Sequence, residues 1–167
     1  MTKTREHFEP QPIRTSTRTV PPEWIDYNGH MNVAYYTMAI DHSLDEVFDM
    51  LGLGIELVQA HNMGPMAIQA QIHYLDELLE GEAFACDFQL LDADHKRMHL
   101  FVTMQHLAKG TAAATWEAMS MNVDLSARRS APYPADCLAR VESLKTAHSA
   151  LPRPPLAGAA MGIRKAR

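Results

Sequence analysis

The sequence contains little cysteine and neither a long hydrophobic run nor an excess of positive charge. Cys86 and Cys137 are its two cysteines, and their spacing fits neither a disulfide framework nor a CxxC metal motif. No stretch approaches the roughly 18 apolar residues that a membrane-spanning helix needs, and the polar start MTKTREHFEPQP contains no apolar segment suited to a signal peptide. We therefore expect a cytoplasmic protein in a reducing compartment, with no membrane partner.

The sequence also lacks the motifs and the charge that are typical of several classes of ligand-binding protein. The formal net charge of −5 argues against a nucleic-acid partner, because phosphate backbones attract basic surfaces. The nine histidines show no HExxH or other tight ligand spacing, so we predict no metal site. The chain has no Walker loop, GxGxxG fingerprint or GxSxG nucleophile elbow. We expect no cofactor.

One long helix is predicted after a short strand. Residues 13–20, IRTSTRTV, are rich in β-branched residues and predict an edge-like strand. In residues 33–52, VAYYTMAIDHSLDEVFDMLG, apolar side chains recur at helical spacing. Asn32 is suited to cap the start of this helix and Gly52 to end it. Three aspartates spaced four residues apart indicate a solvated opposite face, although a cationic ligand or partner can also bind there: Asp41, Asp45 and Asp49.

After the helix the apolar period changes to two, which is typical of strands. The alternating segments are residues 67–75, 83–91, 98–107 and 111–124. Their connectors DELLEG, DADHK and AKG are short and turn-rich, so we predict an antiparallel meander. Residues 134–145 resume helical spacing behind Pro134.

This order of elements predicts one α+β domain in two layers, with a helix on one face of an antiparallel sheet. We expect a flexible lead-in at residues 1–12, the domain at residues 13–149, and a flexible or partner-bound tail at residues 150–167. Such a sheet leaves edges that a second copy would cover, so we expect a homodimer or homotetramer.

The segment DYNGHMNVAYY, residues 26–36, carries a family resemblance. It is similar to the Asp-x-x-Gly-His-x-Asn-x-x-x-Tyr pattern of the 4-hydroxybenzoyl-CoA thioesterase-like branch of the hot-dog acyl-CoA thioesterases. The order of elements from about Thr15 to Leu144 resembles the hot-dog fold, in which an antiparallel sheet wraps around one central helix. Within that branch, EWIDYNGHMN, HYLDELLEGE, DHKRMHLF and ATWEAMSMNVD are similar to the betainyl-CoA thioesterases associated with carnitine dehydrogenases.

The resemblance implies hydrolysis of an acyl-CoA to a carboxylate and CoASH, with betainyl-CoA as the expected substrate in carnitine degradation. In the family the Asp three residues before the Gly is the nucleophile or the general base, and Asp26 occupies that position. Asp26 can instead be only an Asx-turn or capping carboxylate. The amides of Val33 and Ala34 carry the positive end of the helix dipole, and they are suited to stabilise an oxyanion.

The other loop residues have alternative roles. His30 can orient Asp26, contact the thioester or simply hold the loop, and Asn32 is a helix cap that would position the oxyanion amides. Asn28 can bind water or substrate, and Gly29 permits a tight turn. Aromatic faces bind quaternary ammonium groups well, so three aromatic residues near the site are candidates for the acyl group: Trp24, Tyr27 and Tyr35. We assign Tyr36 and Trp116 to the core.

Two further groups of charged residues are candidates. Asp76, Glu77 and His73 can join a site across a dimer interface, although exposed turn residues explain them as well. Four basic residues can contact the phosphates of CoA or can be ordinary surface charges: Lys96, Arg97, Arg128 and Arg129.

Two rival functions differ in their requirements. A hot-dog dehydratase acting on acyl thioesters has a different loop from the one in this sequence. A non-catalytic acyl-CoA binding or sensing module has no need of a carboxylate beside the thioester, and it would normally carry an output domain.

Overall fold

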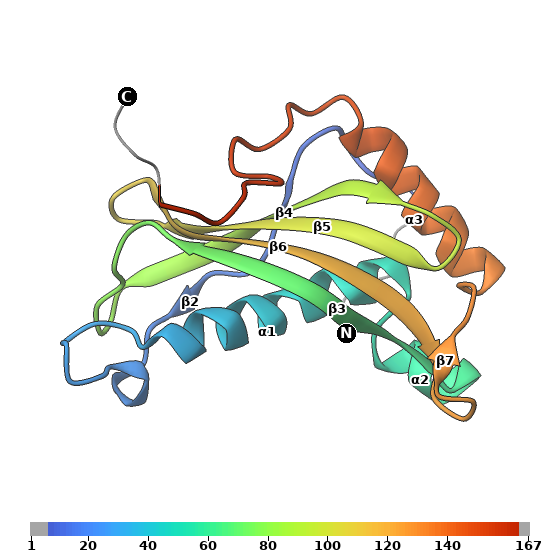
Figure 1. The fold of residues 1–167 in the computed structure, drawn as a ribbon, viewed down its shortest axis with the longest axis horizontal. Coiled ribbons are helices and arrows are strands. Elements are labelled where there is room, and N and C mark those ends of the chain that lie inside the picture. Colours follow the sequence, from blue (N-terminus) through green and yellow to red (C-terminus); the bar gives the residue numbers. More distant parts are fainter. Residues whose placement is uncertain (1–6, 164–167) are drawn as a thin grey trace.

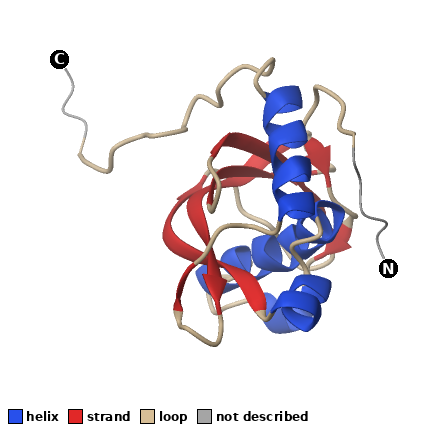
Figure 2. Ribbon diagram, turned by 90° about the vertical axis from the view of Figure 1, so that its right-hand side faces the viewer, coloured by secondary structure: helices blue, strands red, loops and turns tan. Residues whose placement is uncertain are grey.

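The computed structural model describes residues 7–163 (Figure 1). The elements are β1 (Ile13–Arg14), β2 (Arg18–Thr19), a 3₁₀ turn (Pro22–Trp24), α1 (Val33–Leu51), α2 (Ile55–His61), β3 (Met63–Tyr74), β4 (Ala83–Ala93), β5 (Arg97–His106), β6 (Thr111–Asp124), β7 (Arg129–Ser130) and α3 (Ala135–His148). The sheet is antiparallel throughout, and Figure 2 shows it curving around α1. The α+β architecture predicted from the sequence is confirmed.

The order of strands differs from a simple meander. β4, β5 and β6 are consecutive neighbours, but β3 pairs with β6 and not with β4, which gives the path β1-β4-β5-β6-β3. The prediction that DELLEG forms a hairpin connector is therefore wrong. Residues 75–82 instead cross over the start of α1, where Leu78 is fully buried and its carbonyl accepts a hydrogen bond from the Met31 amide at 2.8 Å.

Helix α1 begins and ends where the sequence predicts. The Asn32 side chain accepts a hydrogen bond from the Ala34 amide, and Gly52 ends the helix in the left-handed region at φ 73°. The core-facing stripe includes Ile40, Val47 and Leu51, all fully buried. Asp41 and Asp45 are exposed and Asp49 is half-buried, so one face of α1 meets solvent in the single chain.

The short N-terminal strand is interrupted. β1 and β2 both pair with β4, but residues 15–17 leave the ladder between them. There Thr15 bonds β4 through its hydroxyl, which accepts a hydrogen bond from the Cys86 amide at 3.1 Å. The backbone amide and the hydroxyl of Ser16 both donate hydrogen bonds to the carboxylate of Glu46 on α1. The predicted edge strand is thus present in two pieces.

Helix α3 covers the β4 edge beyond β1 (Figure 2). The Leu90 amide donates to Nδ1 of the buried His148 at 2.8 Å, and Lys145 donates to the Ala93 carbonyl at 2.8 Å. The predicted helix at residues 134–145 is confirmed, and it extends to His148. Helix α2, between Gly54 and Asn62, is an element that the sequence reasoning missed.

The described part of the tail follows the outer face of the sheet (Figure 1). Gln89 on β4 donates to the Pro152 carbonyl, Gln71 on β3 donates to the Ala159 carbonyl, and the Gly158 amide donates to Glu117 on β6. The flexible or partner-bound character of residues 150–167 stays a prediction; through Ala159 the described tail hydrogen-bonds to the chain's own sheet. Residues 1–6 of the predicted lead-in and residues 164–167 of the tail lie outside the described residues.

Between residues 7 and 163, no helix is both long and apolar enough to cross a membrane.

Candidate active site

The loop before α1 closes on itself as a tight turn. Ile25 and Met31 form an isolated antiparallel bridge, and the Asp26 amide donates to the His30 carbonyl at 3.1 Å. Gly29 donates to the Asp26 carbonyl at 2.9 Å and lies at φ 84°, a conformation that side-chain-bearing residues rarely adopt. The turn that was predicted at Gly29 is confirmed, and it fixes the direction in which the Asp26 side chain projects from the backbone.

The Asp26 carboxylate is held at both oxygens and remains half-buried. Its Oδ1 accepts a hydrogen bond from the Asn28 amide at 2.8 Å, and its Oδ2 accepts one from Asn32 Nδ2 at 3.1 Å. The first contact is the Asx turn considered from the sequence. Each oxygen receives one donor, which leaves acceptor capacity for a water or a substrate.

Asn32 connects this carboxylate to the start of the helix. While its Nδ2 donates to Asp26, its Oδ1 accepts from the Ala34 amide at 3.0 Å. The Ala34 amide is therefore occupied by the cap. The Val33 amide has no hydrogen-bond acceptor among the described residues, and it lies at the positive end of the α1 dipole. Of the two amides suggested by the sequence, Val33 is the one free to bind an oxyanion.

His30 contacts the same helix start. Its Nδ1 lies 3.2 Å from the Met31 carbonyl oxygen, and because a carbonyl only accepts, Nδ1 carries the proton in this contact. Its Nε2 makes no hydrogen bond to the described residues. His30 and Val33 together line a pocket of about 370 Å³.

The rest of that pocket comes from α1 and from the crossover after β3. Its other lining residues include Tyr36, Tyr74, Asp76 and Glu77. Tyr36 holds the crossover in place, because its hydroxyl accepts from the Leu78 amide at 3.2 Å and donates to the Asp76 carbonyl at 3.3 Å. Burial raises the pKa of Tyr36, so it stays a hydrogen-bond donor at neutral pH. Tyr74 was not among the predicted site residues, because the sequence marks it only as one of the alternating positions of a strand.

The five aromatic residues considered from the sequence do not form one cage. Trp24 and Tyr35 stack on each other with ring centroids 5.4 Å apart, and Trp24 also packs near Phe84. Tyr27 is 97% exposed at the tip of the loop. Tyr36 is buried, as is Trp116, in agreement with their assignment to the core.

The turn between β4 and β5 and the strand β7 lie at the end of the sheet far from the start of α1 (Figure 1), and the four basic candidates belong to or adjoin these segments. Tyr74, beside the site, pairs with Ala114 on β6, whereas Arg97 pairs with Met121. Seven residues of strand separate these positions, which is roughly 23 Å. Arg128 and Arg129 follow β6 at the same far end. Within one chain these residues do not meet the loop at Asp26.

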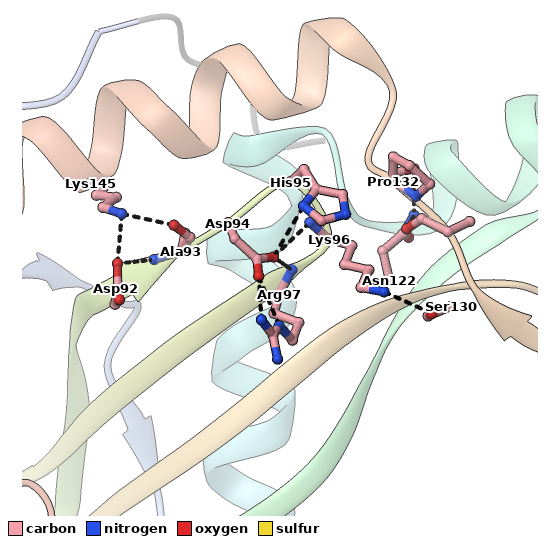
Figure 3. Close-up of polar contacts among 11 residues, drawn as sticks. Asp92, Ala93, Asp94, His95, Lys96, Arg97, Asn122, Ser130, Pro132 and Lys145 are labelled. Atoms are coloured by element: carbon pink, nitrogen blue, oxygen red, sulfur yellow. Dashed lines mark hydrogen bonds and ion pairs between the residues drawn. The ribbon is translucent and has the colours of Figure 1, made fainter.

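Figure 3 shows how the first two basic residues are engaged. Arg97 donates to Asp94 Oδ2 through Nε at 2.8 Å and Nη2 at 2.6 Å, and Lys96 Nζ lies 3.3 Å from Ser130 Oγ. Although partial burial opposes it, hydrogen bonding from Arg97 and from the Lys96 and Arg97 amides lowers the pKa of Asp94 to about 2. Arg97 is therefore neutralised locally, whereas Arg128 and Arg129 make no side-chain ion pair to a described residue.

The dimer-interface candidates separate into two groups. Asp76 and Glu77 line the pocket, but His73 does not. His73 instead lies within hydrogen-bonding distance of Gln71 and Thr115 on the sheet. The described residues contain no group of three or more His, Cys, Asp or Glu side chains arranged to hold a metal ion.

Comparison with known proteins identifies the family. The sequence pattern of the thioesterase-like superfamily matches residues 20–141. The chain belongs to this superfamily. It is 34% identical to the betainyl-CoA thioesterase of Pseudomonas aeruginosa, over 94% of this chain and 99% of that protein. It is 31% identical to the L-carnitine dehydrogenase/betainyl-CoA thioesterase of Rhizobium meliloti, over 92% of this chain and 31% of that longer protein.

Solved structures agree with this assignment. A Staphylococcus aureus protein solved in complex with CoA superposes with a TM-score of 0.86 at 27% identity, covering 94% of this chain and 98% of that one. A thioesterase-like structure from Pseudomonas putida has a TM-score of 0.80, also at 27% identity, covering 92% of this chain and 98% of that one. The fold is the hot-dog fold that the sequence predicted.

Proposed function

We propose that this protein is an acyl-CoA thioesterase that hydrolyses betainyl-CoA to glycine betaine and CoASH. The observation that carries the proposal is the pairing of a fixed carboxylate with a free helix-terminal amide through one residue, Asn32. The similarity over nearly the whole chain to a betainyl-CoA thioesterase supports the substrate.

The Val33 amide is the proposed oxyanion donor. When the thioester carbonyl is attacked, its oxygen becomes negative, and an unoccupied amide at a helix N-terminus stabilises that charge. Loss of one such donor typically costs roughly 3 kcal/mol in the transition state. Capping of Ala34 by Asn32 fixes the first turn of the helix, and thereby the direction of the Val33 N–H.

Asp26 supplies the nucleophile, either directly or through water. In the direct route its carboxylate attacks the carbonyl, the C–S bond breaks, and water opens the resulting anhydride. In the other route Asp26 removes a proton from the attacking water. The thiolate leaves and is protonated to CoASH in both routes. Both require an ionised Asp26, which the Asn28 and Asn32 donors hold in position. His30 contacts the substrate from the pocket wall.

The CoA moiety is proposed to lie across two copies of the chain. β3 ends the sheet with one edge unpaired in the described residues. Antiparallel pairing of two such edges brings each copy's Arg128 and Arg129 to the end of the joint sheet where the other copy's Asp26 lies. This arrangement gives the far basic residues a route to the CoA phosphates. The cytoplasmic location stays a prediction from the sequence.

The proposal is tested by Asp26→Asn with Asp41→Asn as control, because Asp41 is an exposed aspartate of α1 outside the pocket lining, so both changes remove one aspartate charge. We expect Asp26→Asn to fold normally and to lose at least about 10²-fold in kcat, as for removal of a positioned base. CoASH release is followed with a thiol reagent on betainyl-CoA and on short aliphatic, hydroxylated and aromatic acyl-CoAs.

Asp41→Asn should retain wild-type rates. A correctly folded Asp26→Asn variant with near-full activity contradicts the role of Asp26. A wild-type enzyme that prefers another acyl group contradicts the substrate and leaves the thioesterase mechanism standing.

A further inference from the structure

The pocket beside Val33 has two aromatic walls. The rings of Tyr36 and Tyr74 meet edge to face, at 82° with centroids 5.3 Å apart. Tyr36 is 4% exposed, so its ring is mostly enclosed, whereas Tyr74 is 46% exposed and offers an accessible face. A volume of about 370 Å³ falls within the roughly 300–1,000 Å³ typical of small-molecule sites.

The two carboxylates of the pocket differ in their electrostatic state. Asp76 is paired, because Lys109 Nζ lies 3.0 Å from both of its oxygens and Thr111 donates to it as well. Hydrogen bonding from Lys109 accordingly lowers the pKa of Asp76. The Glu77 side chain makes no hydrogen bond or ion pair with a described residue. Glu77 therefore contributes a carboxylate that no cation among the described residues pairs with.

These features match the chemistry of a quaternary ammonium group. Such a group cannot donate a conventional hydrogen bond, so it is bound through aromatic faces and through a carboxylate that no other cation occupies. The position also matches. In a betainyl thioester one methylene separates the ammonium nitrogen from the carbonyl carbon, so the cation must lie close to the oxyanion donor. Val33, Tyr74 and Glu77 line the same pocket.

We infer that Tyr74 and Glu77 form the subsite for a quaternary ammonium acyl group, with Tyr36 as a second wall that also fixes the crossover. The inference rests on the proposed thioesterase function and adds the residues that select a cationic acyl chain. The aromatic residues first suggested for this role lie outside the lining of this pocket: Trp24, Tyr27 and Tyr35.

The test compares betainyl-CoA with 3,3-dimethylbutanoyl-CoA, in which carbon replaces the ammonium nitrogen and the shape is kept. The variants are Glu77→Gln and Tyr74→Leu, with Glu80→Gln as control. Glu80 lies in the same crossover, is exposed, and is outside the pocket lining. We expect Glu77→Gln and Tyr74→Leu each to lower kcat/KM for betainyl-CoA about fivefold, the usual size of a partly exposed ionic or cation–π contact. For the neutral analogue we expect smaller losses than for betainyl-CoA, and Glu80→Gln should leave kcat/KM for both substrates unchanged.

A second readout is the salt dependence of KM for betainyl-CoA. It should be smaller in Glu77→Gln than in Glu80→Gln, because salt screens the interaction of Glu77 with the cation. Equal losses on both substrates, or no loss on either, overturn the subsite while the thioesterase function stands. A wild-type enzyme that does not favour betainyl-CoA over its neutral analogue overturns the proposed substrate together with the subsite. This comparison needs only the wild-type protein.

Discussion

At the scale of single residues, Asn32 both caps α1 and bonds the proposed catalytic residue Asp26. The sequence indicates a helix cap at this position, because Asn precedes an apolar helical run. The structure adds the second contact, from Asn32 Nδ2 to Asp26. The Asn32 Oδ1 atom therefore stabilises the helix, while its Nδ2 atom positions Asp26. Substitutions at Asn32 can remove one contact and keep the other.

Asn32→Ser and Asn32→Ala form a pair that separates these roles. Serine caps helices about as well as asparagine, so Asn32→Ser should keep wild-type stability, whereas Asn32→Ala should lose about 1 kcal/mol. Both remove the donor to Asp26, and we expect both to lower kcat about tenfold, the effect of one hydrogen bond to a charged group. Urea denaturation and CoASH release measure the two effects. Full activity in Asn32→Ser would show that the contact with Asp26 is dispensable.

Much of the loop could be predicted from the sequence, because its geometry is local. Gly29, Asn32 and Asp26 act through residues within six positions of one another. Tyr74 and Glu77 could not be assigned in the same way. Their approach to Val33 depends on where the chain crosses after β3, and that path is determined by strand pairing far away in the sequence.

At the scale of elements, periodicity predicted which segments are strands but not how they pair. Each predicted strand after α1 overlaps an observed one, because alternation is a property of the segment itself. Pairing depends on what covers each edge. The buried Leu78 within DELLEG is the local sign that this connector is not a surface hairpin. α2 was missed because seven residues between Gly54 and Asn62 give too short a periodic pattern.

The attachment of α3 to β4 predicts an acid sensitivity. His148 is 2% exposed, its Nδ1 accepts from the Leu90 amide, and its Nε2 donates to the Gln11 carbonyl at 3.0 Å. Burial lowers its pKa in the folded protein. In the unfolded chain the imidazole titrates near its ordinary value of about 6.5. Below that pH the unfolded state binds a proton that the folded state does not, so the free energy of unfolding decreases as pH falls.

His148→Gln should reduce this sensitivity, because glutamine can make both hydrogen bonds and does not titrate. Urea denaturation at pH 7, 6 and 5 should show a smaller decrease in the variant than in the wild type. The difference is bounded by about 1.4 kcal/mol per pH unit. Equal pH dependence in the two proteins would contradict the role of His148, since the other eight histidines are common to both.

At the scale of the whole molecule, β3 is the strand at one edge of the sheet. Its predicted inward face is not buried in the single chain, where Ile68 is 53% exposed at a bulge between Ala67 and Gln69. Met66 and Leu75 are exposed as well. A long edge strand carrying apolar residues is a surface that a partner strand covers. We propose that a second copy of the chain covers this edge.

Ile68→Lys tests this pairing, with Ile55→Lys as the matched control. Ile55 is 64% exposed in the first turn of α2, outside strand β3. We expect sedimentation velocity to show an oligomer for the wild type and for Ile55→Lys, and a shift toward monomer for Ile68→Lys, because a charge at the strand edge opposes edge pairing. An Ile68→Lys protein that remains fully oligomeric at micromolar concentration would place the interface elsewhere.

The crossover after β3 has a consequence for how substrate range can change. The length of a hairpin is tied to the register of its two strands, so an inserted residue there shifts the side chains of a whole strand. Residues 75–82 join strands that are not neighbours, so their length is free of that constraint. Insertions and deletions in this segment that leave Leu78 in place should reshape the acyl pocket while the sheet, α1 and the Asp26 turn keep their geometry. Divergence of acyl specificity among proteins of this fold can thus proceed through loop length at little cost in stability.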